Sequence, residues 1–205
     1  MYPRLRRYID RTLLHSSRIP SERKLLLDPV AAFVSSKLLT GEPADLTFIC
    51  THNSRRSQIG QVWAAAAAAH FGVESVRTFS GGTEATAFNP RAVAALTRAG
   101  FEIGNPGGDA PRYPVTFATG GRVLECFSKT YDHPDNPAEG FAAIMTCSEA
   151  DEACPVVIGA ALRVPLRYED PKVADGTPGE GAAYDQCCLQ IASEMLWIFA
   201  EACRP

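Results

Sequence analysis

The sequence predicts an α/β fold with a parallel sheet, because short apolar strands alternate with helical segments in the middle of the chain. Leu46–Cys50 is a largely apolar run typical of a buried strand, and an alanine-rich helix is expected over Ser57–His70. Glu74–Phe79 is a second expected strand, and Asn89–Gly100 has the capping signals of a second helix. This strand–helix–strand–helix order predicts parallel strands joined by right-handed crossovers.

The second half of the chain contains further predicted strands and a long final helix. Val115–Phe117 and Arg122–Phe127, joined by a glycine-containing turn, predict a β-hairpin that we interpret as an insertion. Phe141–Thr146 and Val164–Tyr168 are expected strands, and Ala182–Cys203 has the apolar spacing of a helix.

Residues 1–44 are predicted to form an N-terminal helical extension that precedes the main domain at residues 45–205. Ser21 is an expected N-cap, and Pro29 is expected to begin a second helix after Asp28. A dimerisation or lid element is one interpretation of this extension. A helical cap packed on the core is the simpler one.

The composition is that of a globular protein with no membrane span. The chain has 205 residues, 46% hydrophobic and 21% charged, and its net charge of −3 does not favour nucleic acid or an anionic membrane surface as a partner. The longest apolar run, Val62–Ala69, is too short to cross a bilayer. The basic N-terminus has no apolar core typical of a secretory signal, so we expect a cytoplasmic protein.

The seven cysteines do not have the spacing of a disulfide scaffold or of a zinc site. They are at positions 50, 126, 147, 154, 187, 188 and 203. Their number is odd, and they lack the C-x2-C pairs or neighbouring histidines that a structural zinc needs, so no metal is expected. Cys187, Cys188 and Cys203 are expected to be structural residues of the final helix.

The segment Cys50–Ser57 joins a strand to a helix and has the chemistry of an oxyanion-binding loop. Backbone N–H groups of such a loop point inward, and the helix N-terminus adds partial positive charge that favours the Cys50 thiolate. Arg56 offers a planar fork for two oxygens, and Ser57 can donate a hydrogen bond to the sulfur. The expected loop residues are Thr51, His52, Asn53, Ser54, Arg55 and Arg56.

Taken alone, this pattern has a simpler explanation. A cysteine at the end of a buried strand is usually a small apolar residue, and Cys-x5-Arg matches occur by chance. The strand before the loop, the helix after it and the added serine favour a functional loop.

Cys147 and Asp170 follow predicted strands and could join Cys50 at this loop, because ligands of an open parallel sheet bind beyond the carboxyl ends of its strands. Asp170, followed by Pro171, is a candidate general acid, although Asp-Pro also starts ordinary turns. Cys147 and Cys154 flank a short helical segment and are candidates for thiol–disulfide exchange with Cys50. The alternative is two unrelated cysteines.

Three segments resemble the low-molecular-weight tyrosine phosphatase superfamily. Cys50–Gln58 (CTHNSRRSQ) is similar to its anion loop, and Phe79–Leu96 is similar to the segment after its second strand. Thr146–Pro155 (TCSEADEACP) and its spacing to Asp170 resemble the thioredoxin-coupled arsenate reductase branch. The likeness covers about residues 46–203, with residues 110–140 expanded.

The resemblance implies a three-layer sandwich with a central four-stranded parallel sheet, to which the hairpin and the N-terminal extension are added. It also implies a cysteine relay in which Cys50 attacks arsenate held by the loop and Arg56, while Asp170 protonates the departing oxygen. Cys147 then attacks Cys50 and releases arsenite, and Cys154 attacks Cys147. Thioredoxin reduces the resulting disulfide, and no bound cofactor is needed.

The chain departs from this family pattern at several positions. Gln61 stands where many of these reductases have a glutamate that helps to bind potassium, and Asn105–Asp109 is rich in Gly and Pro, so a potassium ion is not expected. Asn53 resembles the asparagine that holds the loop's shape. Arg55 is interpreted as a solvent-facing modulator and not as a substrate clamp.

Two other functions remain open at this level. The first is a phosphotyrosine phosphatase, in which water replaces the attacking thiol, although no aromatic pair follows Asp170-Pro171. The second is an oxyanion-binding or arsenic-sensing regulator on the same fold, which would leave Asp170 without a role.

Overall fold

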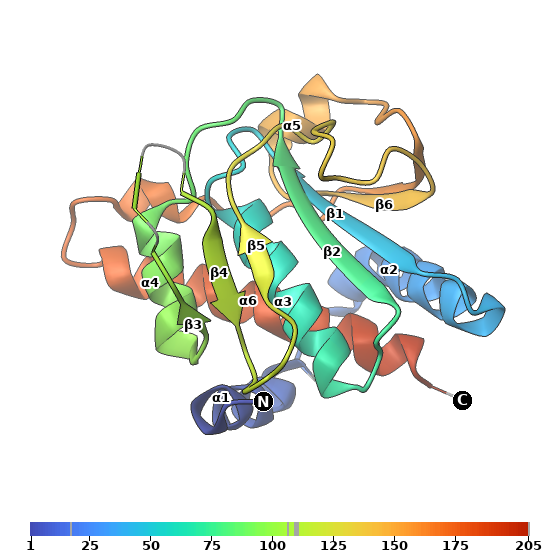
Figure 1. The fold of residues 1–205 in the computed structure, drawn as a ribbon, viewed down its shortest axis with the longest axis horizontal. Helices are drawn as coiled ribbons and strands as arrows, with labels where there is room; N and C mark the ends of the chain where they lie inside the picture. Colours follow the sequence, from blue (N-terminus) through green and yellow to red (C-terminus); the bar gives the residue numbers. More distant parts are fainter. Residues whose placement is uncertain (17, 106, 109–110, 205) are drawn as a thin grey trace.

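The computed structural model describes residues 1–16, 18–105, 107–108 and 111–204 and has a four-stranded parallel sheet at its centre (Figure 1). Across the sheet the strands are β2 (Val76–Gly82), β1 (Ala44–Cys50), β6 (Phe141–Met145) and β7 (Ala160–Val164). The predicted α/β class and the four-stranded parallel sheet are therefore confirmed.

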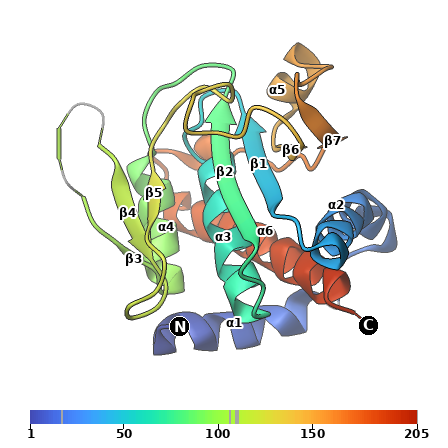
Figure 2. The ribbon, with the colours of Figure 1, turned by 45° about the vertical axis from the view of Figure 1, so that its right-hand side comes forward.

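Helices pack against the sheet, and a small second sheet lies beside it. The helices are α1 (Pro3–Ser16), α2 (Ser21–Thr40), α3 (Arg56–His70), α4 (Pro90–Ala99), α5 (Ser148–Ala153) and α6 (Glu180–Ala202). The strands β3 (Glu102–Ile103), β4 (Tyr113–Thr116) and β5 (Leu124–Cys126) form an antiparallel sheet that contains the predicted hairpin (Figure 2). Residues 106, 109 and 110, in the connection between β3 and β4, lie outside the described part of the chain.

The two faces of the sheet are buried in two separate apolar clusters. Leu46 and Phe48 point into the larger cluster, which α3 and α6 complete. Ile49 and Met145 point the other way, into a smaller cluster that α5 completes. Because both faces are covered, β1 is buried along its whole length, as its near-continuous apolar sequence predicts. The carboxyl ends of β1 and β2 lie at the same end of the molecule as α5 (Figure 1).

The N-terminal segment packs on the core through α1 and α2, and two of its predicted details are wrong. Ser21 is the first residue of α2 rather than its N-cap, a position that Pro20 occupies. Pro29 lies inside α2 and does not begin a new helix. Leu27 and Val34 are fully buried on either side of Pro29, so packing of both halves favours one continuous helix despite the backbone hydrogen bond that proline removes.

The strand predicted at Val164–Tyr168 is shifted. β7 occupies Ala160–Val164 and ends where Pro165, which has no N–H group, interrupts the ladder. The chain then leaves the sheet, and the backbone N–H of Tyr168 donates to the carbonyl of Thr146 at 3.1 Å. This detour carries the following residues toward the end of β6.

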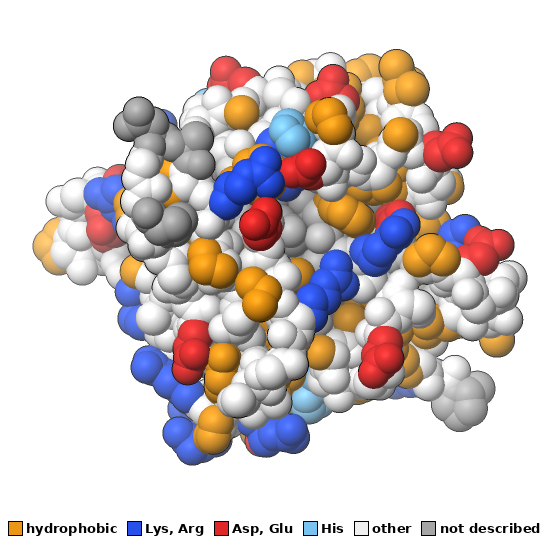
Figure 3. All heavy atoms as spheres, in the orientation of Figure 1, with side chains coloured by type: hydrophobic (Ala, Val, Ile, Leu, Met, Phe, Trp, Pro, Cys, Tyr) orange, Lys and Arg blue, Asp and Glu red, His pale blue; other side chains and the backbone are white. Residues whose placement is uncertain are grey.

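The surface shows mixed charges. On the face drawn in Figure 3, acidic and basic side chains are interspersed among apolar and neutral ones. Among the described residues, no helix has the length and apolar character that a membrane crossing requires.

Gly60 sets the distance between α3 and the sheet. A Cβ atom at this position would lie 2.5 Å from the Phe48 ring. We expect Gly60→Ala to lower the free energy of unfolding by about 2 kcal/mol, because overpacking outweighs the gain in helix propensity. Urea denaturation followed by circular dichroism measures this change.

The matched control is Gly181→Ala in α6, where nothing lies within 4 Å of an added Cβ atom. Its stability should be unchanged or slightly raised. Equal stability of the two variants would contradict the close contact with Phe48.

Candidate active site

Residues 51–55 connect β1 to α3 and bring the Cys50 thiol next to the start of the helix. Cys50 is buried, and its Sγ lies 3.1 Å from the Oγ of Ser57. The Ser57 oxygen already accepts a hydrogen bond from Asn53 Nδ2 at 2.8 Å. Its own hydrogen can therefore point to the sulfur and stabilise negative charge on it.

Asn53 holds the loop in shape. It is the only residue other than glycine among the described residues with a positive φ, 46°, and its side chain is buried. Its Oδ1 accepts hydrogen bonds from the backbone N–H of Lys129 at 2.9 Å and from Gln58 Nε2 at 3.2 Å. Gln58 also donates to the carbonyl of Phe127 at 2.9 Å. These contacts fix the left-handed backbone conformation of Asn53, which is uncommon for residues other than glycine but is adopted by asparagine more often than by most.

Arg56 links the loop to the chain after β7. Its Nη1 donates to the carbonyl of Tyr168 at 2.9 Å, and its Nη2 donates to Asp170 Oδ2 at 2.8 Å. The other Asp170 oxygen accepts a hydrogen bond from the backbone N–H of Lys172 at 3.0 Å. Arg56 and Asp170, predicted from distant parts of the sequence, are thus in direct contact.

Arg55 was expected to face solvent, and this prediction is wrong. Its side chain is only 13% exposed, and its Nη1 lies 3.7 Å from Asp170 Oδ2. Its Nε donates to the Tyr184 hydroxyl at 3.1 Å, and that hydroxyl donates to Asp175 at 2.9 Å. Burial, together with Asp175, raises the pKa of Tyr184 to about 12. The hydrogen bond to Tyr184 of α6 holds Arg55 inward, toward the same carboxylate as Arg56.

Cys147 and Cys154 lie at the two ends of α5, next to the loop. Cys147 belongs to the same small apolar cluster as Cys50, and Cys154 packs against that cluster. The Cys147 Sγ lies 3.5 Å from Thr51 Oγ1 and accepts a hydrogen bond from the N–H of Ala150 at 3.4 Å. Burial raises the pKa of the Cys147 thiol, an effect that these two hydrogen bonds oppose. Cys154 is partly exposed.

Two arginines that the sequence analysis did not single out anchor α5. Arg167 Nε donates to Asp151 Oδ2 at 2.7 Å, and Arg163 Nη2 donates to the Asp151 carbonyl at 2.7 Å. Arg163 Nε also donates to the carbonyl of Cys154 at 3.1 Å. Short acidic helices are usually exposed, so a buried Asp151 was not expected from the sequence.

The remaining predicted residues have other contacts. His52 is exposed, with its Nε2 2.8 Å from Glu84, and Ser54 donates to the carbonyl of Ala87 at 2.7 Å. Gln61 donates to the Thr78 carbonyl at 3.2 Å. The expectation that no potassium ion binds also rested on residues 106 and 109, which lie outside the described part of the chain. Within the described ranges, no three His, Cys, Asp or Glu side chains cluster as a metal site would require.

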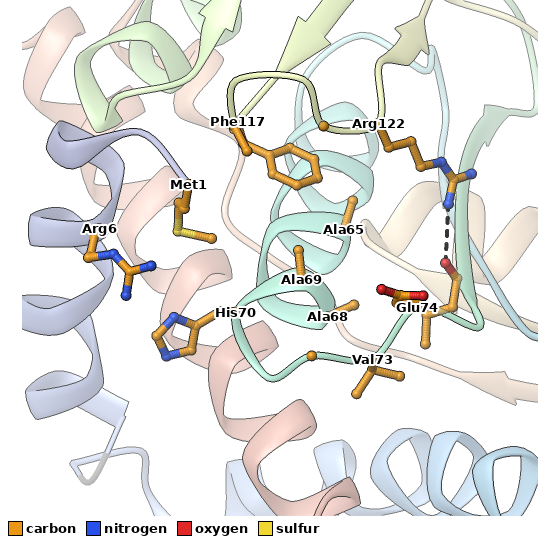
Figure 4. A pocket seen from close by; sticks show the side chains of 14 residues that line it. Met1, Arg6, Ala65, Ala68, Ala69, His70, Val73, Glu74, Phe117 and Arg122 are labelled. Carbon is orange, nitrogen blue, oxygen red and sulfur yellow. Dashed lines mark hydrogen bonds between the residues drawn. The ribbon is translucent and has the colours of Figure 1, made fainter.

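A cavity of about 480 Å³ lies at the opposite end of α3 from the loop (Figure 4). Alanines of α3 line it together with Phe117, and Arg6, His70 and Arg122 lie at its edge. It contains none of the residues that the sequence analysis assigned to the site.

The low-molecular-weight phosphatase-like class is defined by a parallel sheet with a buried cysteine at the end of one strand. A loop follows this cysteine, and Arg-Ser stands at the start of the next helix. An arsenate reductase of Bacillus licheniformis is 30% identical over 154 residues, 75% of this chain and 93% of its own. An arsenate reductase of Bacillus subtilis is 29% identical over the same shares. No family model matches the chain. The chain belongs to the superfamily of low-molecular-weight tyrosine phosphatases and arsenate reductases.

Solved structures show the same fold. A low-molecular-weight protein tyrosine phosphatase from T. tengcongensis has a TM-score of 0.51 at 13% identity, over 77% of this chain and 98% of its own. A YwlE mutant from Bacillus subtilis has a TM-score of 0.51 at 15% identity, over 77% of this chain and 97% of its own.

Asn53 should be required for anion binding by the loop. We expect Asn53→Ala to weaken inorganic phosphate binding about tenfold, since it removes the contacts that hold the left-handed turn. Isothermal titration calorimetry measures the dissociation constant.

Asn136→Ala is the control, because Asn136 is also a buried amide and donates to the carbonyls of Ser80, Thr130 and Tyr131, outside the loop. It should lose stability and keep its phosphate affinity. A similar loss of affinity in both variants would show that Asn53 acts only through overall stability.

Proposed function

We propose that this protein reduces arsenate to arsenite through a relay of three cysteines that thioredoxin regenerates. The observation that carries the proposal is the position of the thiols. Cys50 and Cys147 share one buried cluster, and Cys154 packs against it at the far end of α5. A phosphatase needs only the first of these three thiols.

The first step is attack on arsenic. The Cys50 thiolate forms a bond to arsenic, one oxygen leaves as water, and arsenic stays pentavalent. Arg56 and the loop N–H groups hold the remaining oxygens. The incoming oxyanion competes for the guanidinium that now contacts Asp170 and brings negative charge beside it. Asp170, which the anion displaces from the guanidinium, then donates a proton to the departing oxygen.

The second step transfers electrons. The Cys147 thiolate attacks Cys50 Sγ, an S–S bond forms, and the pair from the broken S–As bond goes to arsenic, which leaves as trivalent arsenite. Cys154 then attacks Cys147 and frees Cys50. The Thr51 hydroxyl and the Ala150 N–H, both near Cys147 Sγ, can stabilise its thiolate in this step.

The last step needs an external dithiol. Cys154 is partly exposed, and the neighbouring Val156 and Ile158 are 74% and 84% exposed. Such an apolar rim suits contact with a protein reductant. Thioredoxin supplies two electrons, so that one arsenate and one reduced thioredoxin give one arsenite, one oxidised thioredoxin and water.

The test is arsenate-dependent NADPH oxidation with thioredoxin and thioredoxin reductase. We expect steady turnover by the wild type and a loss of at least a hundredfold in both Cys147→Ser and Cys154→Ala. Mass spectrometry after arsenate treatment should find a Cys50–Cys147 disulfide in the Cys154→Ala variant. Cys203→Ala, which removes an exposed cysteine at the end of α6, is the control and should be fully active.

Other outcomes would support the competing functions. Full activity of Cys154→Ala would exclude the relay. Rapid hydrolysis of a phosphotyrosine peptide, unchanged in Cys147→Ser, would indicate a phosphatase. Tight arsenate or arsenite binding without turnover would indicate a regulator.

The relay should speed up with increasing pH. Because burial raises the pKa of Cys147, its thiolate is a minor form at neutral pH. We expect arsenite release in a single turnover to rise about tenfold per pH unit between about pH 6 and 8. Thr51→Val removes a hydrogen bond to the sulfur and should move the profile to higher pH.

Thr86→Val is the control for this substitution, since the Thr86 hydroxyl donates to the carbonyl of His52 at 3.0 Å and not to a sulfur. Its pH profile should match that of the wild type. A rate that does not change over this pH range would contradict the role of the Cys147 thiolate.

A further inference from the structure

Helix α2 of the N-terminal extension forms a buried ion pair with α6. Arg23 Nε and Nη2 donate to the two oxygens of Glu194, each at 2.8 Å. The Glu194 side chain is 3% exposed and that of Arg23 is 17% exposed. Gln190 also donates to Glu194, at 3.3 Å. A bidentate pair of this kind fixes direction as well as distance.

Tyr168 joins this ion pair to the chain after β7. Its hydroxyl donates to Glu194 Oε2 at 2.8 Å, and the Arg23 guanidinium carbon lies 5.0 Å from the centre of its ring. Burial and the Glu194 carboxylate raise the pKa of Tyr168, so its hydroxyl stays protonated and remains a donor. The Tyr168 side chain is therefore held on two sides by charged groups.

The backbone of the same tyrosine forms part of the candidate active site. Its carbonyl accepts the hydrogen bond from Arg56 Nη1 at 2.9 Å, and its N–H donates to the carbonyl of Thr146, the residue before Cys147. Asp170, which accepts from Arg56 Nη2, follows two residues later. The segment between Tyr168 and Asp170 thus sets the direction of the Arg56 guanidinium.

We propose that Arg23 is a positioning residue for oxyanion binding, which acts through Glu194 and Tyr168 on the guanidinium of Arg56. This inference rests on the proposed function only in taking the Cys50 loop as the oxyanion site. It gives the N-terminal extension a role in that site, although α2 contributes no atom to the loop.

The physical basis is the cost of leaving Glu194 buried without its cation. Without Arg23, Glu194 keeps the hydrogen bonds from Tyr168 and Gln190 but has no cation, so its carboxylate turns toward water. This movement weakens the contacts on the Tyr168 side chain, and the Tyr168 carbonyl can then move. Arg56 would spend less time in the direction that fits two oxygens of a tetrahedral anion.

The experiment compares inorganic phosphate binding in the wild type, Arg23→Ala and Arg77→Ala by isothermal titration calorimetry, with thermal unfolding measured on each. Arg77 is the matched control, because it forms a bidentate pair with buried Asp45, with both distances 2.6 Å, near the amino ends of β1 and β2. We expect about a tenfold weaker phosphate affinity in Arg23→Ala and a change below about twofold in Arg77→Ala.

Kinetics give a readout that a purely structural role would not produce. The KM for arsenate in Arg23→Ala should rise by about the same factor as the phosphate dissociation constant, while kcat falls by less than about threefold. The change in kcat should be small because an oxyanion, once bound, itself orients Arg56. Arg23→Lys, which restores the charge without the fork, should recover part of the affinity.

If Arg23→Ala does not fold, Tyr168→Phe replaces it, since it removes only the hydroxyl that reaches Glu194. It should weaken phosphate binding about threefold.

Wild-type affinity in a folded Arg23→Ala, or in Tyr168→Phe if it is the variant used, would overturn the inference. So would an equal loss in Arg77→Ala. If the wild type binds phosphate, such a result leaves the proposed function intact. A wild type that binds none would overturn both.

Discussion

Arg56 connects two parts of the chain that are 112 residues apart in sequence, through its hydrogen bond to the carbonyl of Tyr168. The rest of the site depends on this contact. It fixes the start of α3, and with it the loop that surrounds the Cys50 sulfur. It also brings Asp170 to the mouth of the loop. A single guanidinium can do this because its planar fork makes several hydrogen bonds in fixed directions.

The charged side chains around the loop carry a net positive charge. Arg55 and Arg56 both face Asp170, one at 3.7 Å and the other at 2.8 Å. Two cations and one carboxylate leave a net positive field, which attracts an oxyanion. In the proposed mechanism, the same carboxylate acts as the acid once the anion takes its place on the arginines. Arg56 and Asp170 thus set the local charge and also act in the proposed mechanism.

The segment from Cys147 to Cys154 illustrates how much of the structure the sequence predicts. The sequence predicted a helical turn between Cys147 and Cys154, and the structure has α5 there. It did not reveal Asp151, Arg163 and Arg167, which hold that helix against β7. Nothing in a short acidic segment signals that one of its carboxylates will be buried. Similarly, Pro29 signalled a helix start, but packing on both sides of it produced one long helix.

The sequence by itself determined most of the strands, the loop and the side chains that we propose to react. These depend on local patterns: an apolar run, a cysteine and an arginine at a fixed spacing, and a serine at the start of a helix. Only the tertiary structure decided that Arg55 turns inward, that Tyr168 supplies a carbonyl to Arg56, and that Arg23 reaches this tyrosine through Glu194. The physical reason is that these contacts join residues far apart in the chain, whose meeting depends on how α2, α6 and the chain after β7 pack together.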